Sequence, residues 1–226
     1  MTLSSAPRSS GRLALLSIAL TIALVTTLVL VAVARRPTSP PVVTFVGDSY
    51  TAGSVIDTGY AQRFPNIVGR RLNVQSVVVA EPGAGYVAKG VIGERYAEEV
   101  PAIPPESAAV IVYGSRNDVF DGTLTDAVGT AARDLIEQIH RQAPDAQVVV
   151  IGPSYAENPL PPGGVAIDAA IRSACKQTGT RYVDALTWMH QMSPGMIGAD
   201  SIHPTDSGHR WLASKIEPIV REALGD

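Results

Sequence analysis

The strongest constraint on the fold is the alternation of short apolar runs with amphipathic stretches from Val42 onward. Such nearly continuous runs of Val, Ile and Ala are typical of parallel strands that are covered on both faces. Amphipathic stretches between them predict helices. Strands that alternate with helices predict an α/β protein, a three-layer αβα (flavodoxin-like) sandwich with a mostly parallel five-stranded sheet. The predicted strands are residues 42–46, 74–80, 108–114, 146–152 and 181–185, and the predicted helices are about 60–71, 124–142, 164–178 and 206–224.

Length and composition favour one domain with a large core. The chain has 226 residues, of which 46% are hydrophobic and 17% are charged. It carries 18 basic and 21 acidic side chains, and four of the basic ones fall within residues 1–36, which leaves 14 basic against 21 acidic in residues 37–226. This balance argues against a nucleic-acid partner, which would require a basic face. The single cysteine, Cys175, excludes an internal disulfide, and its apolar setting predicts a buried, unreactive thiol.

The N-terminal region contains an uncharged run of 22 residues, 13–34, which is long enough to cross a bilayer as one helix. It is either a signal anchor that remains or a signal peptide cleaved after Ala34, where "AVA" resembles a cleavage site. The run is longer than the usual apolar region of a signal peptide, about 7–15 residues, and this favours an anchor. We expect a tail (1–12), a transmembrane segment (13–34), a linker (35–41) and an extracytoplasmic domain (42–226) at the cell membrane, secreted if the signal is cleaved.

Small and polar residues follow the predicted strands at points that a parallel sheet brings to one edge. The carboxyl ends of the strands in an open α/β sheet are where ligands bind. The turns after the first three strands are "GDSY" (47–50), "EPGAGYV" (81–87) and "GSRND" (114–118), and "DSIH" (200–203) follows the fifth strand. This pattern places Ser49, Asn117, Asp200 and His203 at the same edge.

These residue types suit nucleophilic catalysis. A serine hydroxyl becomes an effective nucleophile when an adjacent base accepts its proton and a third group holds that base. His203 can be the base and Asp200 the group that orients it, while Pro204 disfavours helix at His203. Taken singly, Ser49 could instead cap a helix and Asn117 could belong to an ordinary turn.

From Val42 to the C-terminus the chain resembles the SGNH, or GDSL-type, hydrolases, because the four blocks occur in the family order. The resemblance implies that Ser49 is the nucleophile, with Asp200 and His203 completing the triad, and that no cofactor is used. It also implies an oxyanion hole. Its donors would be the backbone N–H groups of Ser49 and Gly85, with Gly83 as the alternative to Gly85, and the side-chain amide of Asn117. The block "GSRND" has one residue more between its glycine and Asn117 than the short form of the family motif.

A metal site is a weaker interpretation of the same region. Asp200, His203, Asp206 and His209 are spaced three apart, but Pro204 breaks the helix that such spacing would require, so we predict no metal. We expect Asp206 to cap the last helix, His209 to pack in its first turn and Arg116 to be solvated.

The function predicted from the sequence is that of a serine esterase acting on acyl or acetyl esters, either small molecules or components of the cell envelope. An O-acyltransferase would use the same triad. A non-catalytic surface binding protein on this fold is an alternative of another class, but a binding module has no need for the complete set of residues. The substrate is not predicted, and Tyr86, Tyr155 and Trp188 are only candidate pocket walls.

Overall fold

We describe the protein from a computed structural model, which covers residues 18, 21–22, 24–26, 39–120 and 125–225. The chain divides into two compact units, Met1–Ser39 and Pro40–Asp226. Most of the predicted transmembrane segment, 13–34, lies outside the described residues, and those of its residues that are described are helical. Within the covered residues, we find no helix with both the length and the apolar character needed to span a bilayer.

The sheet of the second unit has five strands in the order β2-β1-β3-β4-β5, and all of its strand pairings are parallel. This confirms the predicted five-stranded parallel sheet. The chain moves from β1 to β2 on one side and then returns to place β3 on the other side of β1, so the order reverses at β1. A reversal of this kind opens a crevice at the carboxyl ends of the strands. The strands are β1 (Val42–Gly47), β2 (Gln75–Ala80), β3 (Ser107–Tyr113), β4 (Gln147–Ile151) and β5 (Arg181–Val183).

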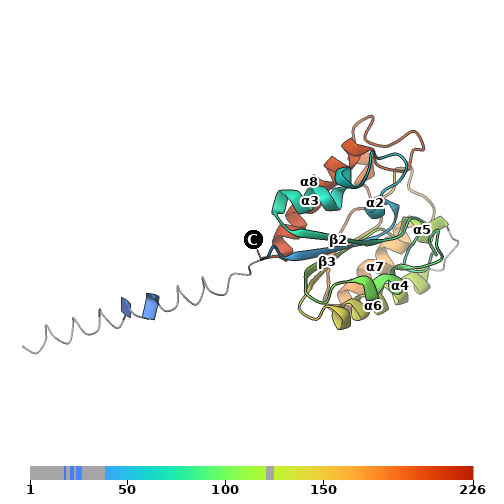
Figure 1. Ribbon diagram of the computed structural model, residues 1–226. Helices are drawn as coiled ribbons and strands as arrows, with labels where there is room; N and C mark the ends of the chain where they lie inside the picture. The colour runs from blue at the N-terminus through green and yellow to red at the C-terminus, as the bar shows by residue number, and fades with distance from the viewer. Residues whose placement is uncertain (1–17, 19–20, 23, 27–38, 121–124, 226) are drawn as a thin grey trace, which may run out of the picture. The chain divides into compact units, whose positions relative to one another are not determined.

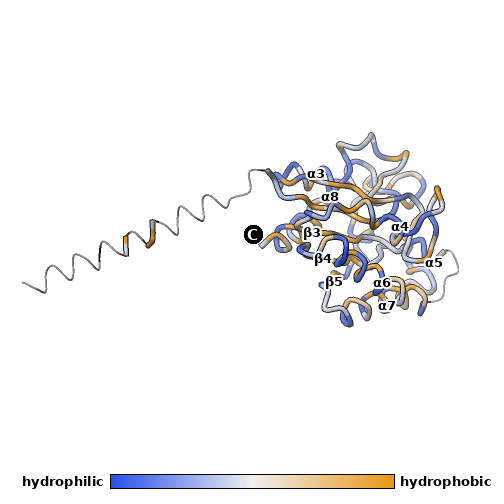
Figure 2. The backbone as a smooth tube through the Cα atoms, turned by 60° about the horizontal axis from the view of Figure 1, so that its bottom comes forward, coloured by the Kyte–Doolittle hydropathy of each residue, from blue (hydrophilic) through white to orange (hydrophobic). Residues whose placement is uncertain are grey.

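Helices cover both faces of this sheet, which confirms the three-layer arrangement (Figure 1). On one face lie α3 (Phe64–Leu72) and α8 (Asp206–Ala223), whose buried side chains meet Val43, Phe45 and Ile111 of the sheet. On the other lie α4 (Tyr96–Glu99), α6 (Thr125–Gln142) and α7 (Gly164–Thr178). Hydrophobic stretches run through the middle of this unit, where the strands lie (Figure 2).

The apolar stripe predicted on residues 124–142 is buried as expected and forms the inner face of α6. Cys175 is fully buried on α7, and burial raises the pKa of its thiol to about 12, in agreement with the predicted structural role.

The predicted helix at 60–71 is divided in two. A 3₁₀ turn, η1 (Tyr60–Gln62), is followed by Arg63 in an extended conformation, and α3 then begins with Pro65 in its first turn. Proline is favoured there because its missing N–H would have no partner within the helix. The last helix also differs in detail, because Thr205, and not Asp206, is its N-cap and accepts a hydrogen bond from the Gly208 N–H.

Several short elements were not predicted because three to five residues are too few to show a helical period. Two of them matter for the site, because α2 follows the carboxyl end of β1 and α5 follows the carboxyl end of β3. The unpredicted elements are α2 (Ser49–Ala52), α4, α5 (Arg116–Phe120) and the 3₁₀ turns η2 (Val100–Ala102) and η3 (Met189–Gln191).

Candidate active site

The corner after β1 places Ser49 at the crevice. Gly47 is required by close packing, because a Cβ at this position would lie 2.4 Å from Thr51 Oγ1 and 2.5 Å from the Tyr113 carbonyl oxygen. Asp48 then caps α2 by accepting a hydrogen bond of 2.9 Å from the Tyr50 N–H. The capping function that Ser49 could have served therefore belongs to Asp48. Ser49 is the first residue of α2, next to the point where the strand order reverses.

A second turn, just before α8, presents His203. Asp200 Oδ1 accepts hydrogen bonds of 3.0 Å from the backbone N–H groups of both Ile202 and His203. The His203 carbonyl accepts a bond from the Gly198 N–H at 2.8 Å. These bonds fix the backbone of the turn, so that the carboxylate and the imidazole ring project from one short, well-defined segment.

Side chains from the two turns form a continuous hydrogen-bonded chain. His203 Nε2 lies 2.9 Å from Ser49 Oγ, and His203 Nδ1 lies 2.6 Å from Asp200 Oδ2. Burial opposes the ionisation of Asp200, but hydrogen bonds from the backbone and ring of His203 outweigh it and lower the pKa of Asp200 to about 2. The carboxylate is therefore charged at neutral pH and can hold the ring in the tautomer that leaves Nε2 facing Ser49.

The imidazole also packs on an aromatic ring from α2. Tyr50 is buried and lies edge-on to His203, with ring centroids 6.1 Å apart. The side chains of His203 and Asp200 remain 25% and 33% exposed. His203 and Asp200 are therefore accessible from the surface of the protein.

Donors suited to a developing oxyanion lie in the adjacent turns. The Ser49 N–H has no hydrogen-bond acceptor among the described residues, whereas the N–H groups that follow it bond to Asp48 or Ser49. Asn117 lies on α5, and its side-chain amide donates to the Ala84 carbonyl at 2.8 Å, which uses one of its two protons. This bond ties "GSRND" to the loop that follows β2.

The backbone N–H of Gly85, which the sequence predicts as an oxyanion donor, already has a hydrogen-bond partner. Its N–H donates to the Ala88 carbonyl at 2.9 Å, so this donor is already engaged. The Gly83 N–H has no backbone acceptor within the described part of the chain, and its φ is +85°. The choice between these two glycines therefore stays a prediction.

Asp118 is a buried residue of the site region whose role was not anticipated from the sequence. Its carboxylate accepts hydrogen bonds from the backbone N–H groups of Tyr86, Val87 and Ala88, at 2.8–3.0 Å, and from Ser115 Oγ at 2.7 Å. A Cβ on Gly85 would lie 2.6 Å from one of its oxygens. The glycine is therefore needed for close approach to Asp118, which organises the loop next to Asn117.

Arg116 is buried, contrary to the expectation of a solvated side chain. It is 8% exposed and forms an ion pair with Glu157. The Glu157 carbonyl is 2.8 Å from His190 Nε2. This ion pair ties α5 to the loop that follows β4. An arginine held in this way is a poor candidate for contacting an acidic substrate.

The four residues with metal-like spacing face different partners. His203 faces Ser49 and Asp200, whereas Asp206 accepts hydrogen bonds from Thr58 at 2.6 and 2.8 Å. His209 is buried in the first turn of α8, stacked on Phe64 as a packing residue. The regular spacing in the sequence therefore does not produce a converging set of ligands.

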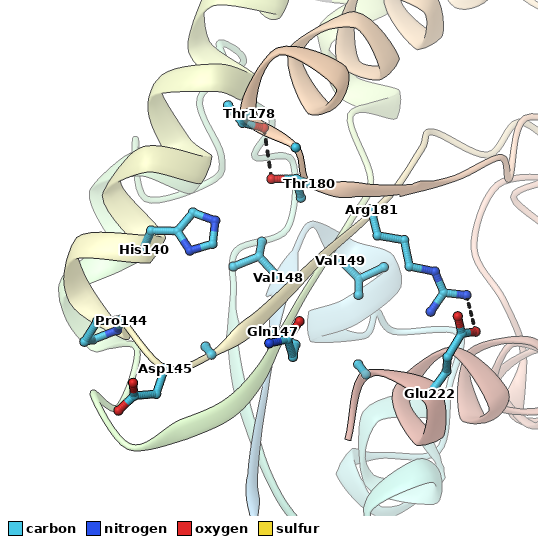
Figure 3. A pocket seen from close by; sticks show the side chains of 13 residues that line it. His140, Pro144, Asp145, Gln147, Val148, Val149, Thr178, Thr180, Arg181 and Glu222 are labelled. Carbon is cyan, nitrogen blue, oxygen red and sulfur yellow. Dashed lines mark hydrogen bonds and ion pairs between the residues drawn. The ribbon is translucent and has the colours of Figure 1, made fainter. Parts of the chain in front are cut away.

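The candidate pocket walls are mostly core residues, since Tyr86, Tyr155 and Trp188 are all buried. A cavity of about 470 Å³ lies elsewhere, at the amino ends of β4 and β5, where Gln147 and Arg181 begin their strands (Figure 3). The ion pair between Arg181 and Glu222 borders it. Because Ser49 follows the carboxyl end of β1, this cavity lies at the opposite edge of the parallel sheet.

A hydrogen-bonded Ser-His-Asp arrangement at the switch point of a parallel sheet defines a class of hydrolase. The model of the GDSL-like lipase/acylhydrolase family matches residues 45–211. The chain belongs to this family of SGNH hydrolases. A GDSL lipase of Mycobacterium tuberculosis is 31% identical over 193 residues, which cover 80% of this chain and 82% of the relative.

Solved structures agree on the fold. TesA superposes with a TM-score of 0.67 at 20% identity, covering 81% of this chain and 99% of its own. A family two carbohydrate esterase from Clostridium thermocellum, solved in complex with cellohexaose, gives a TM-score of 0.66 at 18% identity, covering 84% of this chain and 66% of the esterase.

Proposed function

We propose that the protein is a serine esterase that hydrolyses acyl or acetyl esters through Ser49, His203 and Asp200. The observation that carries the proposal is the pair of hydrogen bonds that joins Ser49 Oγ to His203 Nε2 at 2.9 Å and His203 Nδ1 to Asp200 Oδ2 at 2.6 Å. Membership of a hydrolase family supports it.

In the first step, Ser49 Oγ attacks the ester carbonyl while its proton passes to His203 Nε2. The charge of Asp200 stabilises the imidazolium that forms. Collapse of the tetrahedral intermediate expels the alcohol, which takes the proton from His203, and leaves an acyl group on Ser49. Water then repeats the sequence, with His203 again as base, and releases the acid.

The oxyanion of each intermediate would be stabilised by the Ser49 N–H and by the second proton of the Asn117 amide. Donors fixed in advance toward the developing charge usually provide the largest single contribution to catalysis. The Ala84 carbonyl holds the Asn117 amide in place at 2.8 Å. We also propose a donor from the loop after β2, Gly85 or Gly83.

The openness of the site supports a proposal for the substrate class. Because His203 and Asp200 stay partly exposed, we propose esters with short acyl groups, on small molecules or on the larger molecules of a cell envelope. The outward location remains a proposal that rests on the apolar run at 13–34.

A series of aryl esters with acyl chains of increasing length tests the proposal. We expect the ratio kcat/KM to be highest for acetyl or other short chains and to fall with length. A fluorophosphonate probe should label Ser49, as located by peptide mass spectrometry. Labelling at another residue, or an absence of turnover with every ester, would reject the proposed mechanism.

A further inference from the structure

Three carboxylates lie close together at the loop that joins β2 to α4. Glu81 directly follows β2, Glu94 lies in the loop and Glu99 ends α4. One carboxylate oxygen from each of them lies within 4.8 Å of the other two. Like charges at this separation repel one another strongly when they are away from water. Ionisation of all three carboxylates together is therefore unfavourable unless a proton or a cation offsets their charge.

The loop is folded around the carboxylate of Glu81. This carboxylate accepts hydrogen bonds from the backbone N–H groups of Ile92 and Glu94. The chain also passes so close at Gly90 that a Cβ there would lie 2.3 Å from Glu81 Cδ. Two backbone donors thus fix the position of one acid, while the other two acids have no comparable support.

Glu99 is the second observation that points to a ligand. It is only 8% exposed, and its Oε2 is buried with no hydrogen-bond partner among the residues that the structure describes. Within the described residues, no Lys or Arg side chain forms an ion pair with Glu81, Glu94 or Glu99. Burial, together with the charges of Glu81 and Glu94, raises the pKa of Glu99 to about 8. A buried carboxylate of this kind is satisfied either by a proton or by a cation.

We propose that Glu81, Glu94 and Glu99 bind one divalent cation, with Ca²⁺ as the preferred ion. Calcium takes six to eight oxygen ligands at about 2.3–2.6 Å in flexible geometry. Two oxygens bound to one such ion are therefore at most about 5 Å apart, which agrees with the separation of these carboxylates. Magnesium needs shorter bonds in a near-ideal octahedron and keeps several waters, so a site made of three carboxylates suits it less.

The cation would hold together the two ends of the loop between β2 and α4, whereas Asp118 holds the middle of this loop. Asp118 accepts hydrogen bonds from the backbone of Tyr86, Val87 and Ala88, while Glu81 accepts them from the backbone of Ile92 and Glu94. Ala84, whose carbonyl accepts from Asn117, lies between these two attachments. Binding should therefore stabilise the folded protein and order the loop beside the candidate oxyanion donors, whichever reaction the site performs.

The test uses the full chain in a non-ionic detergent after treatment with a chelator. Titration with CaCl₂ at pH 7 is followed by calorimetry and by thermal unfolding. We expect one saturable site and a midpoint of unfolding that rises with Ca²⁺ concentration, because a ligand that binds only the folded state stabilises it. MgCl₂ should give a smaller shift at the same concentration.

Two variants locate the site. Glu94→Gln and Glu99→Gln should each weaken Ca²⁺ binding by at least about tenfold, because affinity depends on the number of charged ligands. Glu106→Gln is the matched control, since Glu106 is exposed and forms no hydrogen bond or ion pair within the described chain, and it should bind like the wild type. Glu94 is exposed, and its side chain makes no hydrogen bond within the described part of the chain, so Glu94→Gln should fold even if Glu99→Gln does not.

The absence of Ca²⁺ binding in the wild type would overturn the proposal, as would unchanged affinity in Glu94→Gln. If Glu99→Gln raises the stability of the protein and Ca²⁺ has no effect on the wild type, a proton occupies the place that we assign to the cation.

Discussion

The hydroxyl of Ser49 lies 2.9 Å from Nε2 of His203, although the two residues are 154 positions apart in the chain. Ser49 follows the first strand of the sheet and His203 follows the last, so the parallel order brings both to one edge. This contact joins the proposed nucleophile to its proposed base, and the first two predictions test it.

Replacing the proposed nucleophile should abolish turnover and leave the fold intact. Ser49→Ala removes one hydroxyl from a partly exposed position, so the unfolding midpoint should stay within a few degrees of that of the wild type. Hydrolysis of an aryl acetate should fall by about 10⁴–10⁶-fold. Ser193→Ala is the control, because Ser193 is exposed and its hydroxyl forms no hydrogen bond in the described chain. Wild-type rates in Ser49→Ala would reject the assignment.

The role of Asp200 predicts a loss of kcat. Asp200→Asn replaces the carboxylate that faces His203 Nδ1 at 2.6 Å and favours the wrong tautomer of the ring. We expect kcat to decrease by about 10⁴-fold. Asp206→Asn is the comparison, since Asp206 bonds to Thr58 and not to His203. Equal losses of kcat in both variants would indicate damage to the segment and not the loss of an orienting charge.

Asn117 should act mainly in the transition state. Asn117→Ala should lower kcat by about 10²–10³-fold, corresponding to about 2.7–4 kcal/mol, with little change in KM. Combination with Ser49→Ala should add almost nothing, because groups that act as one unit are strongly non-additive. An increase in KM alone would show that Asn117 binds substrate and does not stabilise the oxyanion.

His209 predicts a specific pH dependence of stability. Burial lowers the pKa of its ring to about 4 from the ordinary value of 6.5, so the folded state holds it neutral. As pH falls from about 6.5 to 4, His209 becomes protonated in the unfolded chain but stays neutral in the folded chain. The free energy of unfolding therefore decreases over this range. Relative to His209→Gln, the wild type should lose up to about 3 kcal/mol of unfolding free energy over this range.

Urea unfolding at several pH values measures this difference. His140→Gln is the matched control, because it removes a histidine from an exposed position on α6. A constant difference between the wild type and His209→Gln from pH 7 to pH 4 would contradict the prediction.

The apolar run at 13–34 predicts that the full chain remains with membranes during an alkaline carbonate wash. Intact-mass measurement of the protein from its native host should then show that Ala34 and Arg35 are still joined. A mature chain that begins at Arg35 would replace the anchor with a cleaved signal. Protease added to intact cells should digest the domain, and protection until lysis would refute the outward orientation.

The sequence by itself determined the fold class and the candidate site residues. Runs of Val and Ile mark strands that are buried on both faces, and the period of 3.6 residues marks the stripe on α6, because both patterns depend only on which side chains avoid water. The blocks that contain Ser49, Asn117 and His203 follow strands, and the chain order of a parallel sheet then assigns them to one edge. These inferences are local or topological, so they need no coordinates.

Only the tertiary structure decided which partner each polar group has. Asp118, Arg116 and Glu99 are charged residues, which usually lie at the surface, but each of them is buried. Asp118 accepts hydrogen bonds from backbone N–H groups, and Arg116 pairs with Glu157. Glu99 lies close to other carboxylates. The Gly85 N–H is engaged by a carbonyl three residues ahead, which no motif specifies. A hydrogen bond depends on distance and direction within a few tenths of an ångström, whereas hydrophobic burial is non-directional and can be read from composition along the chain.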